Sequence, residues 1–255
     1  MGKGNAKRAA AAALANEPPP KAASARKETM AAAVYLRLAD DILTGRLAPG
    51  QKLPFDMLRQ TYGYSVSPLR EALQRLAIEN WVDAVDHIGF RVAPVSLEDL
   101  RDINTMRTLL EPRALREAVE NGDIAWETKV VSAAHKLSRM PIPEDPASAA
   151  ADVWEDAHRE FHEALISACP SRRLLQFCRL LFAQFRRYRR LVLTRYWSSE
   201  ALRATVDAEH KRVIDAALDR HAEKAAELLA QHYSRSAERV IAEYKRLSPR
   251  ESPKR

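Results

Sequence analysis

The first third of the chain places apolar residues at the spacing of short amphipathic helices. Apolar positions recur every three or four residues from about 31 to 44, where Gly45 ends the run, and again from 55 to 62. A third helix is predicted in YSVSPLREALQRLAIEN, because Ser67 can cap its N-terminus and Pro68 suits its first turn. The pattern therefore predicts three short helices in succession.

The hydrophobic period changes after the third helix. Two short β-capable runs, at about 81–85 and 90–93, are joined by a polar turn that contains Gly89. Three short helices followed by a hairpin predict a winged helix-turn-helix. From Leu97 onward there is no strand signal, and short breaks separate about six helices, so neighbouring helices should pack antiparallel in a bundle. These helices are expected at about 97–121, 124–139, 148–168, 171–196, 199–219 and 222–246.

The resulting fold class is mostly α, with a winged helix-turn-helix at 29–94 and a helical bundle at 95–247. A length of 255 residues is sufficient for two such domains. Residues 1–28 combine basic residues with an Ala-rich run that is too weak for an export signal, so we expect a disordered basic tail. The polar residues 248–255 are expected to be disordered as well.

Charge and cysteine content indicate a class of binding partner and a cellular compartment. The formal net charge is +7, which favours a polyanion partner. However, residues 29–94 carry seven basic and seven acidic side chains, whereas residues 172–195 carry eight arginines and no acidic residue. Cys169 and Cys178 fit neither a disulfide framework nor a metal pair, and no apolar stretch is long enough to cross a membrane. We therefore expect a cytoplasmic protein with no membrane partner.

Three segments resemble a known family in order and spacing. DDILTGRLAPGQKLP, LRQTYGYSVSPLREALQRLAIEN and GFRVAP resemble the winged helix of GntR-type bacterial transcriptional regulators, over residues 30–94. The resemblance implies that the third helix enters the major groove of double-stranded DNA and that the wing reaches an adjacent groove or phosphate. Val66 stands where the family usually has Arg, and Tyr64 stands where Val is usual, so one phosphate or base contact is missing. The positions carried over as DNA-binding are Ser65, Ser67, Pro68, Arg70, Gly89 and Arg91.

The residues also support DNA binding on physical grounds. A helix N-terminus presents free N–H groups to phosphate, small hydroxyls allow close approach, and an Arg one turn into the helix can bind a guanine edge. Arg70 occupies that position. The alternative is a winged helix used for protein contacts.

Four histidines lie on apolar faces of the predicted bundle helices: His158, His162, His210 and His232. The first two are one helical turn apart, so their imidazoles can converge on one ion. A single such histidine is more often a core residue, but four that point inward from three helices favour a metal site. A degenerate site that binds no metal is the alternative.

A second resemblance concerns this bundle. HREFHEAL and EHKRVIDAALDRHAEKAAELLAQHY resemble the FCD ligand-binding domain found behind GntR-type winged helices, whose metal-binding members use an Asp and three His. The four histidines match those positions, with His158 standing where Asp is usual. Four imidazoles favour zinc, nickel or cobalt over manganese or calcium. They also leave the ion's charge uncompensated, which makes a small carboxylate the natural effector.

Two arginines are candidates for binding the effector beside the metal site. Arg189 falls on an apolar helical face, and Arg107 does so four residues before Glu111. Either Arg107 pairs with Glu111 and Arg189 reaches the bundle edge, or one or both arginines bind the carboxylate of an effector beside the metal. The resemblance supports the second alternative, because FCD domains commonly bind small organic acids. Four further arginines are expected to face solvent or to pair with acidic residues of the last two helices: Arg179, Arg186, Arg187 and Arg190.

These features favour a metabolite-responsive transcriptional regulator that binds a pseudo-palindromic operator as a homodimer. The resemblance implies repression. A metal sensor without an organic effector is one alternative. A helical metal hydrolase is another, but Glu163 and Glu209 are expected to point away from the face that His162 and His210 occupy, which leaves no general base. We therefore expect no enzymatic activity.

Overall fold

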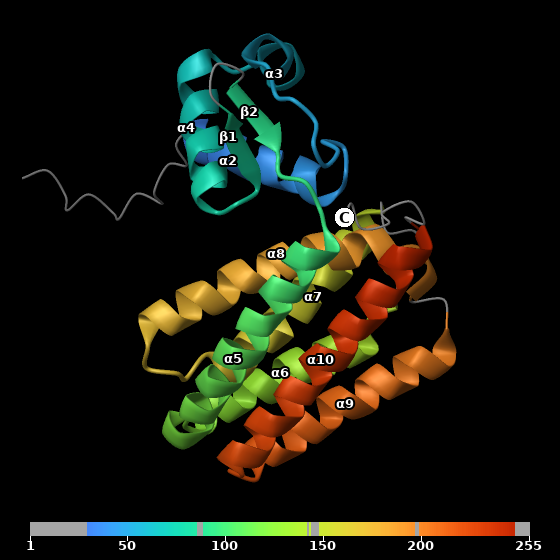
Figure 1. Cartoon of the computed structure of the whole chain (residues 1–255). Coiled ribbons are helices and arrows are strands. Elements are labelled where there is room, and N and C mark those ends of the chain that lie inside the picture. The colour runs from blue at the N-terminus through green and yellow to red at the C-terminus, as the bar shows by residue number, and fades with distance from the viewer. Residues whose placement is uncertain (1–29, 86–88, 142, 144–147, 197–198, 248–255) are drawn as a thin grey trace, which may run out of the picture.

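The computed structural model describes residues 30–85, 89–141, 143, 148–196 and 199–247. In Figure 1 a small unit, containing three helices and a two-stranded hairpin, lies above a bundle of long helices. The mostly α-helical fold with an N-terminal winged helix is as predicted. In chain order the elements are α2 (Met30–Leu43), α3 (Phe55–Tyr62), α4 (Val66–Ile78), β1 (Val82–Val85), β2 (Gly89–Val92), α5 (Leu97–Asn121), α6 (Ile124–Arg139), α7 (Ala149–Ile166), α8 (Arg172–Tyr196), α9 (Glu200–Leu218) and α10 (Ala222–Leu247).

The small unit has its own apolar core, to which α2, α4 and the hairpin all contribute. The strands are antiparallel, with Val82 opposite Val92, and the residues of the wing tip lie outside the described part of the chain. One expectation for α4 is wrong: Ser67 does not cap the helix. The N-cap residue is Ser65, whose side chain makes no capping hydrogen bond, and Ser67 lies within the first turn.

The bundle helices agree with the predicted boundaries to within two residues. Their main core draws on α5, α6, α7, α9 and α10. The sharp turn between α5 and α6 requires Gly122, because a Cβ atom there would lie 2.2 Å from the Trp126 ring. This turn lets α6 fold back against α7 and brings α7 into the middle of the bundle, where it carries two of the candidate histidines.

Helix α8 connects the two units (Figure 1). The Gln184 amide donates a hydrogen bond of 3.0 Å to the carbonyl of Glu79, the C-cap residue of α4. Arg187 donates to the carbonyl of Ala93, just after β2. The Tyr188 hydroxyl accepts a hydrogen bond of 3.2 Å from the backbone N–H of Ser96, the residue before α5. One helix of the bundle thus holds both the C-terminal end of α4 and the base of the hairpin.

The position of α8 overturns the expectation for three of its arginines. Arg187 and Arg190 are each only 6% exposed, and Arg186 is also largely buried. Arg190 pairs with Asp152, and Arg186 lies 3.3 Å from Glu155, so their partners are on α7 and not on the last two helices. Because α8 packs against α7 on one side and the winged helix on another, more than its apolar face is buried. Arg179 is exposed, as predicted.

Candidate metal centre and DNA-binding surface

Three helices bring the four candidate histidines together. His158 and His162 come from α7, His210 from α9 and His232 from α10, and each side chain is less than 8% exposed. The predicted inward faces are therefore confirmed.

The ring nitrogens are spaced as metal ligands are. The Nε2 atoms of His158 and His162 lie 3.2 Å apart, and those of His210 and His232 lie 3.3 Å apart. One nitrogen from each of His158, His162 and His210 lies within 4.8 Å of the other two. Metal–nitrogen bonds of about 2.0–2.1 Å at tetrahedral angles separate two ligands by roughly 3.4 Å. The spacing within the pairs thus matches an edge of a tetrahedral site.

Hydrogen bonds from neighbouring side chains orient two of the rings. The Nδ1 atom of His232 lies 2.8 Å from the Glu209 carboxylate. The Nδ1 atom of His162 lies 3.0 Å from the Tyr233 hydroxyl, which in turn donates to Glu111 at 2.5 Å. In both cases the ring donates from Nδ1–H, which leaves the lone pair of Nε2 directed at the centre. A ring held in this tautomer is prepared to coordinate an ion.

His158 has a different environment. Its ring stacks on Trp154 with centroids 5.0 Å apart, and its buried Nδ1 atom has no hydrogen-bond partner among the described residues. This is the position at which the resembling family usually has Asp. Its Nε2 atom already faces the Nε2 atom of His162, so the donor set still fits a metal without a carboxylate ligand.

Burial controls the charge of the cluster. Removal from water, with contributions from neighbouring positive groups, lowers the pKa of all four imidazoles below the usual range, so they are neutral and competent to bind a metal. Burial alone would raise the pKa of Glu209, but hydrogen bonds from His232 and Arg239 outweigh it and bring that pKa to about 2. The carboxylate partner of His232 is therefore ionised.

Sequence reasoning misplaced one side chain near the histidines, Glu209, and missed two others, Tyr233 and Glu155. Glu209 does not point away as expected: it is 3% exposed and contacts His232, because α10 covers that side of α9. Tyr233 and Glu155 were not anticipated. Glu155 precedes His158 by three residues and His162 by seven, a spacing that places all three on one face of α7.

The two arginines proposed for effector binding both point into the bundle, and both have internal partners. Arg107 donates to Glu111 at 2.8 Å, as the first alternative predicts, and stacks on the Tyr233 ring. Arg189 is 4% exposed instead of reaching the bundle edge, and it makes a two-point contact with Glu155. The remaining cavity between these arginines and the histidines is about 10 Å³. That volume admits about one water molecule.

The predicted DNA-contacting residues lie at the start of α4 and on β2. Ser65, Ser67 and Arg70 are exposed at the N-terminus of α4, whereas Pro68 is buried beneath them. The Arg70 guanidinium lies 4.9 Å from the centre of the Phe55 ring. In the wing, Gly89 has a φ of 98°, a conformation that favours glycine, and Arg91 is half-buried on β2.

An exposed helix N-terminus beside a hairpin is the arrangement with which winged helices read DNA. Joined to a separate helical domain, it is the arrangement of a DNA-binding transcriptional regulator. Among the described residues, no helix has the length and apolar character needed to cross a membrane.

Comparison with known proteins specifies the family. Residues 30–92 match the family described as "Bacterial regulatory proteins, gntR family", and residues 102–235 match the FCD domain. The chain is 41% identical over 210 residues to the uncharacterized HTH-type transcriptional regulator BphR of Paraburkholderia xenovorans, covering 82% of this chain and 84% of the relative. It is 35% identical over 198 residues to the HTH-type transcriptional repressor GlaR of Escherichia coli, covering 78% and 90%.

A solved structure shows the same fold. The E. coli McbR/YncC structure superposes with a TM-score of 0.69 at 21% identity, covering 85% of this chain and 99% of the other. The chain therefore belongs to the GntR family of bacterial transcriptional regulators and carries an FCD domain. The family members to which the chain is similar are transcriptional regulators and not enzymes.

Proposed function

We propose that this chain is a repressor whose affinity for operator DNA is set by a divalent metal, zinc or nickel, held by His158, His162, His210 and His232. The observation that carries the proposal is that one ring nitrogen from each of His158, His162 and His210 lies within 4.8 Å of the other two, while His232 Nε2 lies 3.3 Å from His210 Nε2. Tyr233 and Glu209 fix the rings of His162 and His232 in the ligating tautomer. Repression is supported by the similarity of the chain to the transcriptional repressor GlaR of E. coli. When bound, the ion would link α7, α9 and α10 through its histidine ligands.

An organic acid is the second part of the proposal. Arg107 and Arg189 flank the histidines, and guanidinium groups bind carboxylates in two-point geometry. Because Glu111 and Glu155 already occupy these arginines, a small carboxylate effector enters by exchange with an internal carboxylate and by expansion of the 10 Å³ cavity. That small volume favours a second candidate, a sensor that responds to the metal alone.

Helix α8 provides the connection between the metal centre and the DNA-binding unit. The Phe182 ring lies 5.8 Å from His158 and 5.6 Å from His162, measured between centroids. Two residues further along, Gln184 holds the C-cap residue of α4. A shift of α8 caused by the metal therefore moves the recognition helix relative to the bundle. Such a shift changes operator affinity only if the metal binds one arrangement more tightly.

On the DNA side, we propose that the exposed end of α4 enters the major groove and that Arg70 contacts a base edge. Ser65 and Ser67 approach the phosphates with Pro68 fixing the first turn, while Gly89 and Arg91 place the wing. One such unit reads few bases, so the chain acts in the cytoplasm as a homodimer on a pseudo-palindromic operator. Size-exclusion chromatography with light scattering tests this: a monomer on the operator contradicts it.

The central experiment compares operator binding in defined metal states. An operator fragment is selected from random double-stranded DNA with the full chain, and its dissociation constant is measured by fluorescence anisotropy. The measurement uses metal-free protein, protein with zinc or nickel, and protein with metal plus a panel of organic acids. We expect the metal to change the constant by roughly 5- to 150-fold, the usual range of coupling between two sites.

The His162→Ala/His210→Ala double variant should lose the metal response, and His135→Ala, at an exposed histidine of α6, should retain it. A response that survives in the double variant contradicts the metal proposal. If metal alone gives the full change and no acid adds to it, the chain is a metal-only sensor. If an acid changes operator affinity only in metal-loaded protein, the carboxylate effector is supported.

A further inference from the structure

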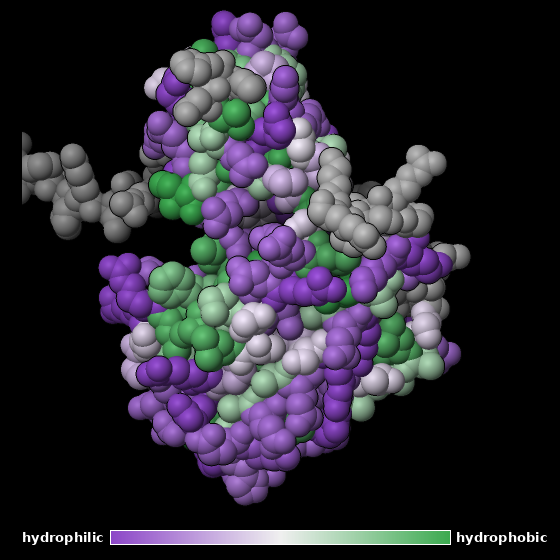
Figure 2. Space-filling view, in the orientation of Figure 1, coloured by the Kyte–Doolittle hydropathy of each residue, from purple (hydrophilic) through white to green (hydrophobic). Residues whose placement is uncertain are grey.

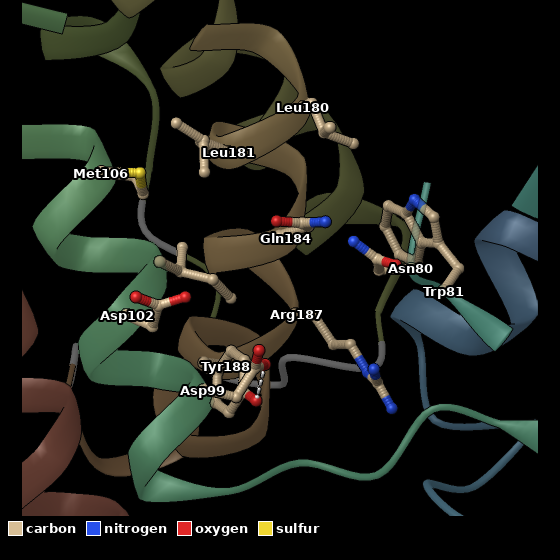
Figure 3. Close-up of a pocket in the computed structure, with 11 residues that line it drawn as sticks. Asn80, Trp81, Asp99, Asp102, Met106, Leu180, Leu181, Gln184, Arg187 and Tyr188 are labelled. Carbon is tan, nitrogen blue, oxygen red and sulfur yellow. Dashed lines mark hydrogen bonds between the residues drawn. The ribbon is translucent and has the colours of Figure 1, made fainter. Parts of the chain in front are cut away.

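The outer surface formed by α5 and α8 carries large apolar side chains that are open to solvent. Leu109 of α5 is 61% exposed, and Phe177 of α8 is 56% exposed. Met106 and Leu180 are partly buried in a cleft of about 270 Å³ below the winged helix, and Figure 3 shows them on its α5 and α8 walls. In Figure 2 hydrophobic side chains gather over these two helices at the left of the bundle. A contiguous exposed apolar patch marks an interaction surface.

Along α5 the same surface follows a repeat of seven residues. The contacting positions of paired helices recur at alternating intervals of three and four residues. In α5 the exposed or partly buried positions with this spacing are, in chain order, Asp99, Asp102, Met106, Leu109, Arg113 and Arg116. We call these positions the α5 stripe. It begins with two acids, continues with two apolar residues and ends with two arginines.

The charged ends of the α5 stripe are open to a partner. Asp102 is exposed and forms no ion pair within the described part of the chain. Arg113 lies 3.1 Å from Glu117, and its side chain remains 65% exposed. Arg116 lies 3.1 Å from Glu223, and its side chain remains 39% exposed. Exposed ion pairs contribute little to stability, so both arginines can also bind carboxylates of another molecule.

Helix α8 adds to the basic end of the surface. Its Tyr188 hydroxyl donates to Asp99 at the acidic end of the stripe. Arg172 and Arg173, at the start of α8, are about four helical turns from Tyr188, and both are exposed. The α5–α8 surface therefore has an acidic end beside the winged helix, an apolar centre and a basic end.

We propose that two copies of the chain join through this surface. The inference rests on the homodimer proposed above and assigns its interface. In a two-fold dimer both copies use the same surface, so each contact occurs twice. When the two α5 helices lie antiparallel, the stripe of one copy matches the stripe of the other. The facing positions are Asp99 with the partner's Arg116, Asp102 with the partner's Arg113, and Met106 with the partner's Leu109.

The pattern favours a second copy over an unrelated protein. Reversing the α5 stripe exchanges its acids with its arginines and leaves the apolar positions at the centre. This is the symmetry that an antiparallel pairing of identical helices requires. Each charged position then faces the opposite charge, and the apolar layer is enclosed between the charged ones. A partner of different sequence would place no such constraint on this chain.

The pairing also sets a distance between the two DNA-binding units. Each winged helix joins its bundle just before α5. Leu97, the first residue of α5, lies level with the partner's Ala118, so the two α5 N-termini are about 30 Å apart at 1.5 Å per residue. Two-fold dimers read half-sites about 34–36 Å apart, one turn of DNA. The proposed interface thus spaces the two attachment points by nearly one turn.

The first test disrupts the apolar centre, with sedimentation equilibrium of the full chain as the measurement. Leu109→Asp should raise the dimer dissociation constant about 30-fold or more, because it places a charge in the apolar layer of both copies. Val131→Asp is the matched control, since Val131 of α6 is 49% exposed and lies outside this surface. Its dissociation constant should equal that of wild type. Both positions are exposed, so both variants should keep the circular dichroism of wild type.

The second test exchanges charges across the interface. Asp102→Lys and Arg113→Glu should each raise the dissociation constant about tenfold or more, because each replaces two attractive pairs by two repulsive ones. The two substitutions change the net charge in opposite directions, so a general charge effect cannot weaken both dimers. An equimolar mixture of the two variants should dimerise as tightly as wild type, because each then meets opposite charges at both places.

The outcomes separate the interface from the homodimer itself. A wild-type chain that is still monomeric at about 100 µM contradicts both proposals. If wild type dimerises and Leu109→Asp does so equally tightly, or if the mixture of charge variants is no tighter than either variant alone, this interface is wrong and the homodimer stands. Dissociation by Val131→Asp in place of Leu109→Asp overturns the assignment in the same way.

Discussion

The hydroxyl of Tyr233 offers a direct test of how the metal centre is built. Tyr233→Phe removes a single oxygen atom that accepts from His162 Nδ1 and donates to Glu111. The Phe side chain fills the same space, so the packing of α10 should be retained. What is lost is the group that fixes the His162 ring with Nε2 facing the centre.

The expected loss of metal affinity follows from the role of hydrogen-bond partners that orient ligating imidazoles. Removing a group that orients a ligating imidazole weakens metal binding by about 10- to 100-fold, or roughly 1.4–2.7 kcal/mol. The variant should also lower the free energy of unfolding of metal-free protein by about 1–3 kcal/mol, because one oxygen of the buried Glu111 carboxylate loses its donor. The two effects are separable, because the second does not require metal.

The assay is competition for zinc between the protein and a chromogenic chelator, with urea unfolding of metal-free protein measured in parallel. Tyr244→Phe is the matched control: it removes a phenolic hydroxyl from the same helix, one that donates to the Val95 carbonyl away from the histidines. Its zinc affinity should stay within about twofold of wild type. A Tyr233→Phe protein with wild-type zinc affinity would refute the role assigned to this hydroxyl.

Three further predictions address the other contacts. Arg70→Ala should weaken specific operator binding by about 1–3 kcal/mol in an anisotropy titration, and Arg179→Ala, at an exposed arginine, is the control. An equal loss of affinity for unrelated DNA would exclude a base contact. Gln184→Ala should leave zinc affinity unchanged but reduce the metal-driven change in operator affinity by about 2- to 12-fold, because one hydrogen bond of about 0.5–1.5 kcal/mol between the units is lost. An unchanged response would show that other contacts couple the metal centre to the DNA-binding unit. Glu155→Gln should lower the free energy of unfolding by on the order of 3 kcal/mol, because Arg189 loses its buried counter-charge, and should tighten the binding of small carboxylates from the organic-acid panel. Glu163→Gln on the same helix should do neither. A stable Glu155→Gln protein that binds none of these acids would argue against carboxylate exchange.

The sequence was sufficient to locate the helices and the inward histidines. Apolar spacing along a helix reports which side is buried, so His158, His162, His210 and His232 were placed on the correct faces. The spacing of Arg107 and Glu111 offered their ion pair as one of two alternatives, because residues four apart on a helix are neighbours, and the structure contains that pair.

What the sequence did not reveal were polar groups buried on a second side of a helix. Arg187 and Arg190 lie off the apolar face of α8, and only the packing of α7 and the winged helix encloses them. Glu209 follows the same logic on α9, where α10 supplies both the covering surface and the histidine that it contacts. A hydrophobic pattern identifies one buried stripe per helix, whereas paired charges can be buried anywhere that a partner meets them.

The attachment of the winged helix to α8 sets how sensitive the regulator is. Among the described residues, two hydrogen bonds of α8, from Gln184 to Glu79 and from Arg187 to Ala93, join the two units. At about 0.5–1.5 kcal/mol each they sum to a few kcal/mol, the same order as the free energy that couples two sites in typical regulators. A much stronger attachment would hold the DNA-binding unit in one placement regardless of what binds in the bundle. With a much weaker attachment, the placement of the DNA-binding unit would not depend on the bundle. With an attachment of this strength, occupancy of a small internal site is enough to redistribute the placements of the DNA-binding unit.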